Sequence, residues 1–289
     1  MFLRAVGQLL LILITLAVPS VGYSIESRDS RNHHEVEFIL DVLPENLQSF
    51  NLTKDGKAIV PELRKGNPAL REIALTFDDG PHPLYTAQLL AILRYYRVPA
   101  TFFMVGVQAE RYTEWVKMVF QEGHEIGNHT YDHFRLVNLP YDEQVYQIEA
   151  FQELIHKITG VYPRFLRPPG GQFDRATVEL MNKNGLALGL WTINSKDGTQ
   201  IGSAEMLRNL LKQAESGSII LFHDGREETI RVLPSLIETL KRRGFRFVTM
   251  SQMLLHANSS TILSAQVTEE SDQTAEEQQP KGSWKVYSY

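Results

Sequence analysis

Short apolar runs alternate with amphipathic segments through the middle of this 289-residue chain, from about residue 71 to residue 257. The runs have the length of buried strands and end at turn residues, as IALTF at 73–77 does before Asp-Asp-Gly-Pro. The segments between them carry apolar residues at helical spacing. Because strands that alternate with helices form parallel sheets with helical crossovers, about seven such units predict an α/β barrel or near-barrel.

Local signals set the bounds of the expected elements. Gly123 and Gly160 end helices, and Asp174 caps the start of another. The segment from 24 to 70 is a poorly periodic lead-in, which leaves 71–257 as the main domain. We expect strands at 73–77, 100–105, 125–127, 165–166, 186–193, 218–222 and 245–249, and helices at 86–96, 114–121, 141–159, 176–184, 204–214 and 229–243.

The two ends of the chain differ from the middle. Arg4 is the only charge before an uncharged, mainly apolar run that reaches residue 23, which is typical of a signal peptide over residues 1–23. The alternative is an uncleaved membrane anchor, because the run is just long enough to span a bilayer. Both predict an exported protein: periplasmic, associated with the cell wall, secreted or membrane-anchored. Residues 258–289 form a polar, acidic tail that we expect to be disordered.

Charge and cysteine usage exclude several classes of function. The chain has 29 Lys and Arg against 34 Asp and Glu, a net charge of −5, so no basic surface for nucleic acid is expected. Cysteine is absent, which excludes disulfides, thiol catalysis and cysteine-ligated zinc. Any bound metal ion must therefore be held by His, Asp and Glu.

Polar residues follow four of the expected strands. Because carboxyl ends of parallel strands meet at one edge, we expect these residues to share a rim. They are Asp78-Asp79, His129 with His133, Arg167, and His223-Asp224.

The residue types in these groups point to metal-dependent chemistry. Adjacent carboxylates repel each other unless they have different partners, so one of Asp78 and Asp79 suits a metal and the other proton transfer. His129 and His133, four residues apart, would face the same ion from a helical turn. Each group also has a purely structural explanation. Asp-Gly-Pro is ordinary turn chemistry, the histidine spacing can arise by chance or packing, Arg167 can be a surface residue, and His223 can be a core histidine.

In order along the chain, the segment TFDDGP at 76–81, His129-x-x-x-His133, Arg167-x-Pro169 and Leu221-x-His223 resemble the motifs of the NodB-homology polysaccharide deacetylases, carbohydrate esterase family four. The resemblance covers residues 71–255. It implies a distorted (β/α) barrel, usually of seven strands, and one divalent metal ion, commonly zinc, with cobalt or nickel as alternatives. The implied reaction removes acetyl groups from an acetylated polysaccharide.

The resemblance also implies roles for individual residues. Asp79, His129 and His133 become metal ligands, Asp78 the general base and His223 the general acid. Arg167 orients Asp78, Asp197 supports His223, and the N–H of Gly170 donates to the oxyanion.

The sequence departs from the family at the groove. Gly170 and Gly198 stand where many relatives have aromatic residues, and Asn194 stands where many have Asp. We therefore expect an open groove suited to a decorated polymer, unless Trp191 or Phe173 fills the space near Gly170. Peptidoglycan is the favoured substrate. The alternatives are chitin or poly-N-acetylglucosamine, an O-acetylated polysaccharide, a small amide, or a relative that binds saccharide without catalysis.

Overall fold

The computed structural model of the protein describes residues 61–257. The expected signal or anchor over 1–23, most of the lead-in at 24–70 and the tail at 258–289 lie outside these described residues. Between residues 61 and 257, no helix has both the length and the apolar character needed to cross a bilayer.

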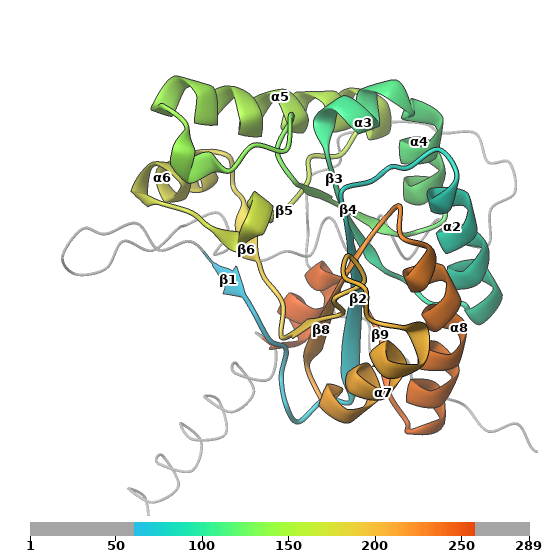
Figure 1. Ribbon diagram of the computed structural model, residues 1–289. Coiled ribbons are helices and arrows are strands. Elements are labelled where there is room, and N and C mark those ends of the chain that lie inside the picture. The colour runs from blue at the N-terminus through green and yellow to red at the C-terminus, as the bar shows by residue number, and fades with distance from the viewer. Residues whose placement is uncertain (1–60, 258–289) are drawn as a thin grey trace, which may run out of the picture. The chain divides into compact units, whose positions relative to one another are not determined.

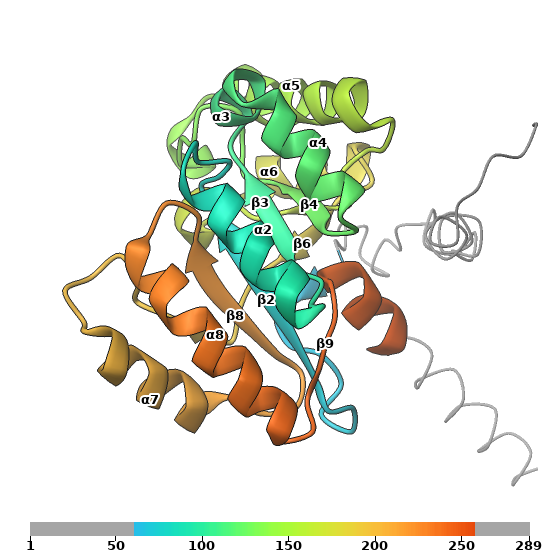
Figure 2. The ribbon, with the colours of Figure 1, turned by 90° about the vertical axis from the view of Figure 1, so that its right-hand side faces the viewer.

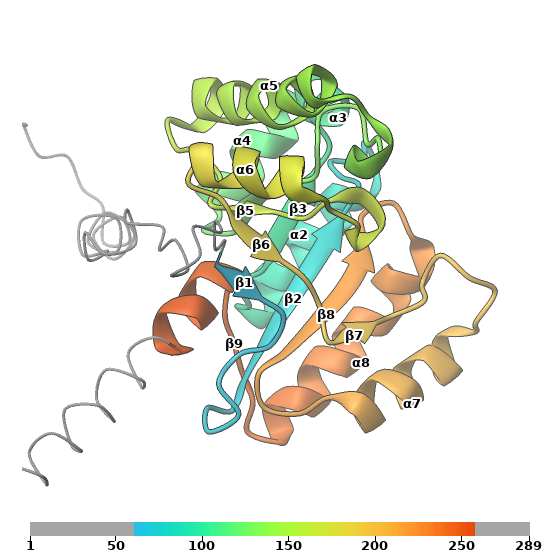
Figure 3. The same cartoon turned by 90° about the vertical axis from the view of Figure 1, so that its left-hand side faces the viewer.

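The described strands form one parallel sheet in the order β1-β6-β5-β4-β3-β2-β8-β7, and β9 pairs with the first residues of β2. Figure 3 shows the sheet curling from β1 and β6 round to β8 and β7, which confirms the predicted distorted (β/α) barrel. The strands are β1 (Glu62–Leu63), β2 (Glu72–Asp78), β3 (Thr101–Met104), β4 (Glu125–Asn128), β5 (Phe165–Leu166), β6 (Ala187–Gly189), β7 (Ile193–Asn194), β8 (Ser218–His223) and β9 (Arg246–Phe247).

Helices cover the outer face of the sheet (Figure 1). In Figure 2, α2 and α8 lie side by side over β2 and β8, and α7 packs against α8. The helices are α2 (Tyr85–Tyr96), α3 (Gly106–Arg111), α4 (Thr113–Gln121), α5 (Tyr141–Thr159), α6 (Arg175–Lys183), α7 (Ser203–Gln213) and α8 (Glu227–Arg242), and residues 250–257 are also helical.

The central strand β2 is buried along its whole length, as its continuous apolar run predicts. Phe77 on β2 packs its ring 5.1 Å from that of Phe102 on β3 and 5.8 Å from that of Phe222 on β8. These rings belong to the main hydrophobic core, which lies between the sheet and its helices. Burial of such aromatic side chains fixes the three strands on which most site residues depend.

The predicted helix at 141–159 is confirmed with the same bounds as α5, and Gly160 ends it with φ 78°. Asp174 caps α6 as expected, since its carboxylate accepts the backbone N–H of Thr177 at 2.9 Å. Three elements were missed: the two-residue strand β1, which lies within the predicted lead-in and pairs with β6, the short helix α3, and the helix at 250–257.

The prediction of one strand over 186–193 is wrong, because the chain forms two strands there. β6 pairs with β1 and β5, whereas β7 pairs with β8 on the far side of the sheet. At the break, the carbonyls of Gly189 and Leu190 accept hydrogen bonds from the Arg167 side chain, each at 3.0 Å. A buried guanidinium thus takes the place of a neighbouring strand as hydrogen-bond partner.

The sheet register brings the polar strand ends to one rim. Asp78 ends β2 and pairs with His223 at the end of β8, while Asn128 at the end of β4 pairs with Leu166 at the end of β5. The residues that follow these positions include His129 and Arg167. The fold therefore supplies the shared rim that the sequence predicts.

Candidate active site

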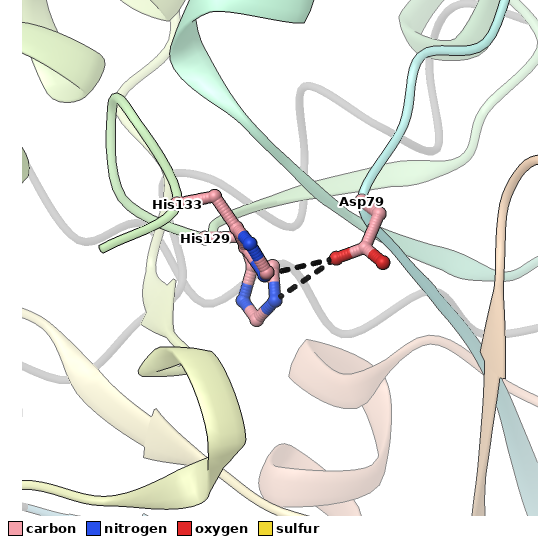
Figure 4. Close-up of side chains that lie close together, drawn as sticks. All are labelled: Asp79, His129 and His133. Carbon is pink, nitrogen blue, oxygen red and sulfur yellow. Dashed lines mark ion pairs between the residues drawn. The ribbon is translucent and has the colours of Figure 1, made fainter. Parts of the chain in front are cut away.

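Asp79, His129 and His133 form a cluster in which each residue offers one ligand atom, all within 4.8 Å of one another. Asp79 Oδ1 lies 3.1 Å from His133 Nε2 and 3.5 Å from His129 Nε2. Figure 4 shows both imidazole rings facing the Asp79 carboxylate. Two imidazoles and one carboxylate suit a divalent transition metal, and three protein ligands leave coordination positions open.

The prediction that a helical turn presents the two histidines is wrong. Residues 129–135 form an irregular loop after β4, in which Thr130 and His133 have φ values of 68° and 63°. Left-handed residues reverse the chain within a few positions, so His133 folds back toward His129 and their ring centroids lie 5.0 Å apart. Asp79 also has a positive φ, 73°, which turns its side chain out of the strand direction of β2.

The hydrogen bonds around His129 fit a metal ligand. The ring is buried, and its Nδ1 lies 2.6 Å from the carbonyl oxygen of Arg167. Since a carbonyl can only accept, Nδ1 carries the proton and Nε2 keeps its lone pair toward Asp79. This carbonyl contact is the ordinary means by which proteins fix the tautomer of a ligating histidine.

Electrostatics in the cluster favour an ionised carboxylate. Burial raises the pKa of Asp79, but hydrogen bonds and charge interactions with His129 and His133 outweigh burial and hold this pKa below its usual range. The hydrogen bond with Asp79 raises the pKa of His133 against the opposing effect of burial. A divalent cation bound by these three groups would take the place of the proton in the hydrogen bond between His133 and Asp79.

Asp78 has a different partner from Asp79. Arg167 is fully buried, and its Nη1 donates to Asp78 Oδ1 at 2.6 Å and to the hydroxyl of Thr76 at 2.8 Å. The ring of Phe103 lies 3.9 Å from the guanidinium carbon and that of Trp191 lies 5.5 Å from it. These four contacts, with the hydrogen bonds to the carbonyls of Gly189 and Leu190, hold the guanidinium in one place, so the Asp78 carboxylate is fixed and charge-compensated.

His223 is paired with a second buried carboxylate, as the resemblance implies. His223 Nδ1 lies 2.7 Å from Asp197 Oδ1, and the backbone N–H of His223 donates to Asp197 Oδ2 at 2.8 Å. Burial lowers the pKa of His223, but the hydrogen bond to Asp197 and its charge raise it above the usual value. The hydroxyl of Thr229 also donates to Asp197 Oδ2, at 2.5 Å, a contact for which the sequence offered no signal.

Asp224 lies behind the rim. Its carboxylate packs against Gly80 and accepts the hydroxyl of Thr86 at 2.5 Å. Burial raises its pKa to about 7. The sequence grouped Asp224 with His223, but the structure separates them: the histidine is half-buried at the rim, and the aspartate fills the space beneath the turn after Asp79.

The structure brings Gly170 to the same rim, in a 3₁₀ turn at Pro169–Gly171, with φ 72° and an exposed backbone. The sequence left open that Trp191 or Phe173 fills the space near Gly170, but the side chain nearest to that space is Arg135. The nearest atoms to the point where a Cβ on Gly170 would lie belong to Arg135, the closest at 3.5 Å. Trp191 is half-buried and lies against Gly171 instead.

The sequence over residues 65–189 matches a family model described as polysaccharide deacetylase. The chain is also 38% identical, over 187 residues, to a peptidoglycan-N-acetylglucosamine deacetylase of Bacillus cereus; this match spans 63% of the chain and 87% of that relative. The chain belongs to the polysaccharide deacetylase family. It is therefore a hydrolase of the kind that removes acetyl groups from polysaccharides.

Two further relatives of this deacetylase bear on fold and substrate. The crystal structure of a peptidoglycan N-acetylglucosamine deacetylase superimposes with a TM-score of 0.64 at 34% identity, over 66% of this chain and 91% of that one. A chitooligosaccharide deacetylase of Bradyrhizobium is 32% identical over 198 residues, which are 63% of this chain and 90% of the relative. The family thus includes enzymes named for two different glycans.

Proposed function

We propose that this deacetylase hydrolyses the acetamido groups of N-acetylglucosamine units in peptidoglycan, outside the cytoplasm. The observation that best supports the proposal is that two adjacent carboxylates have different partners. Asp78 bonds to the buried Arg167, while Asp79 faces two histidines. A turn with no chemical role would not need two such different environments for neighbouring residues.

Asp79, His129 and His133 are the proposed ligands of one divalent ion, with zinc as first choice and cobalt or nickel as alternatives. The donor set of two nitrogens and one oxygen and the fixed tautomer of His129 support this assignment. When bound, such an ion polarises the acetyl carbonyl and makes water more acidic.

Asp78 is the proposed general base. Its carboxylate accepts a proton from the water that attacks the acetyl carbon, and the hydrogen bond from Arg167 holds the carboxylate in place. Arg167 has no exposed surface, so solvent does not reach the guanidinium that holds Asp78. The exposed N–H of Gly170 is the proposed donor to the oxyanion that forms when water adds to the carbonyl.

His223 is the proposed general acid. It gives a proton to the amide nitrogen as the C–N bond breaks, so that the products are acetate and a free amine on the sugar. Asp197 holds the protonated ring through its 2.7 Å contact with Nδ1, which leaves Nε2 to face the leaving nitrogen. General acid–base help of this kind is worth roughly 10²–10⁴-fold in rate.

The choice of substrate rests on the relatives and on the N-terminal sequence. The Bacillus cereus relative and the solved structure are named for peptidoglycan. A signal peptide or anchor over residues 1–23 would deliver the enzyme to the side of the membrane where this polymer lies. Peptidoglycan is therefore favoured over chitin, which the Bradyrhizobium relative's name suggests.

The test is acetate release from a panel of peptidoglycan, chitin oligomers, acetylxylan and poly-N-acetylglucosamine, with the zinc-loaded protein. We expect release from peptidoglycan at the highest kcat/KM, and loss of most of it in Asp78→Asn. Wild-type enzyme that releases acetate only from chitin oligomers or acetylxylan would refute the substrate. A fully active Asp78→Asn variant would refute the proposed base.

A further inference from the structure

Two exposed arginines border the site without a partner. Within residues 61–257, neither the Arg135 nor the Arg226 guanidinium forms a hydrogen bond or ion pair. Nearby exposed charges do pair, as Arg231 does with Glu227 one turn into α8. Unpaired guanidinium groups next to a substrate site are free to bind a ligand.

Arg135 covers one side of the site. It follows His133 by two residues, and its Nε and Nη2 lie 3.5 and 3.8 Å from the point where a Cβ on Gly170 would stand. Gly170 in turn follows Arg167, the partner of Asp78, by three residues. A Cβ on Gly170 would therefore be in van der Waals contact with the Arg135 guanidinium.

Arg226 occupies the corresponding place beside the proposed acid. It follows His223 by three residues, and its Nη2 lies 4.0 Å from the point where a Cβ on Gly198 would stand. Gly198 follows Asp197, the partner of His223. A second glycine on the rim therefore also has a guanidinium in front of it.

The sheet order places the two arginines on different sides of the reacting centre. Arg135 lies in the loop after β4, and Gly170 follows β5, on one side of β2. Arg226 lies in the loop after β8, on the other side of β2. The Asp78 carboxylate at the end of β2 thus lies between two positively charged loops.

The overall charge of the chain bears on which substrates the two arginines can bind. The chain carries a net charge of −5, and the charge of Asp78 is already compensated by Arg167. An acidic polymer would be repelled from such a surface unless local positive charge offset the repulsion. A neutral glycan would gain little from two exposed guanidinium groups, which bind carboxylates through paired N–H donors.

We propose that Arg135 and Arg226 bind carboxylates that the substrate glycan carries on either side of the reacting sugar. The ligand class is a carboxylate-bearing glycan, such as one with lactyl ether groups on alternate sugars. This proposal rests on the proposed function and narrows it, since it selects an acidic polymer over a neutral polymer of the same acetylated sugar.

The experiment compares two soluble oligomers of equal length in the zinc-loaded protein. One alternates N-acetylglucosamine with lactyl-bearing N-acetylmuramic acid, and the other is a neutral chitin oligomer. The measured quantity is the ratio of kcat/KM for the acidic oligomer to that for the neutral one. Arg135→Ala and Arg226→Ala should each lower this ratio about two- to fivefold, the range of an exposed ion pair. Arg208→Ala, an exposed arginine on α7, is the matched control and should leave it unchanged.

Salt and binding give independent readouts. Raising the salt to about 1 M shortens the Debye length to roughly 3 Å. The wild-type ratio of the two kcat/KM values should then fall toward that of a double variant that carries both Arg135→Ala and Arg226→Ala. Calorimetric binding of the acidic oligomer to zinc-loaded protein should weaken in both single variants. An unchanged ratio together with unchanged binding would overturn the proposal. Arginine-dependent binding without acetate release from either oligomer would support the carboxylate site and refute the proposed function alone.

Discussion

Replacement of Asp197 by Asn tests the link between a buried carboxylate and the proposed acid. Asp197 accepts the Nδ1–H of His223, the backbone N–H of the same residue, and the hydroxyl of Thr229. Asn keeps the size of the side chain and one oxygen acceptor, but it has no charge, and its NH₂ group faces a donor that the second carboxylate oxygen accepts. Its effect should therefore fall on the protonation and the hydrogen bonding of His223.

The expected size follows from the contact. Hydrogen bonds to charged groups contribute about 1.5–3 kcal/mol, and one pKa unit corresponds to about 1.4 kcal/mol. The pKa of His223 is raised by Asp197 against the effect of burial, so loss of the charge should lower it. The protonated acid is then lost at lower pH. Activity should therefore start to fall at a lower pH than in the wild type.

The assay is the pH profile of kcat/KM for acetate release. The alkaline limb should move to lower pH in Asp197→Asn, and activity on the alkaline side should drop roughly 10- to 100-fold. Asp174→Asn is the matched control, because Asn also caps a helix and α6 is far along the chain from His223. An alkaline limb that stays where the wild type has it would refute the role of Asp197.

Three further experiments test other contacts. Asp79→Ala should abolish binding of one equivalent of zinc in a chelator titration, whereas Asp78→Asn should retain the ion and lose turnover; equal metal loss in both would contradict the division of roles. Arg167→Met should lower the free energy of unfolding by about 3–5 kcal/mol in urea, since it leaves a buried carboxylate unpaired; a loss below about 1 kcal/mol would argue against that pairing. Gly185 has φ 63° and open space around it, so Gly185→Ala should cost only the backbone strain, about 1–3 kcal/mol. Gly217 has φ 81° and faces a backbone carbonyl, so Gly217→Ala should lower the free energy of unfolding further. Equal losses in the two variants would contradict the close approach of that carbonyl to Gly217.

Features with a local physical cause could be predicted from the sequence. The bounds of α5 follow from its periodicity and from the left-handed Gly160, and the start of α6 follows from Asp174. The gathering of Asp78, His129 and His223 follows from parallel pairing, since each comes at or just after the end of a strand. These features depend on short stretches of chain or on a general rule of parallel sheets.

Features that depend on distant contacts could not be predicted. β1 is only two residues long, so it has no alternation to detect. The break between β6 and β7 depends on the side chain of Arg167, more than twenty residues earlier in the sequence. The loop that carries His133 depends on two left-handed residues that are not glycine, Thr130 and His133 itself, and such positions give no compositional signal.

The arginine at residue 167 also sets the order in which the enzyme can become active during folding. Its partners come from β2, from the break after β6 and from the helix at 250–257, so its contacts close loops of 22 to 91 residues. Contacts across such separations form late, because the entropy of loop closure must be overcome first. Local helices and hairpin-sized contacts can exist well before Asp78 has its cation. We therefore expect turnover to return after denaturation only when the sheet is complete.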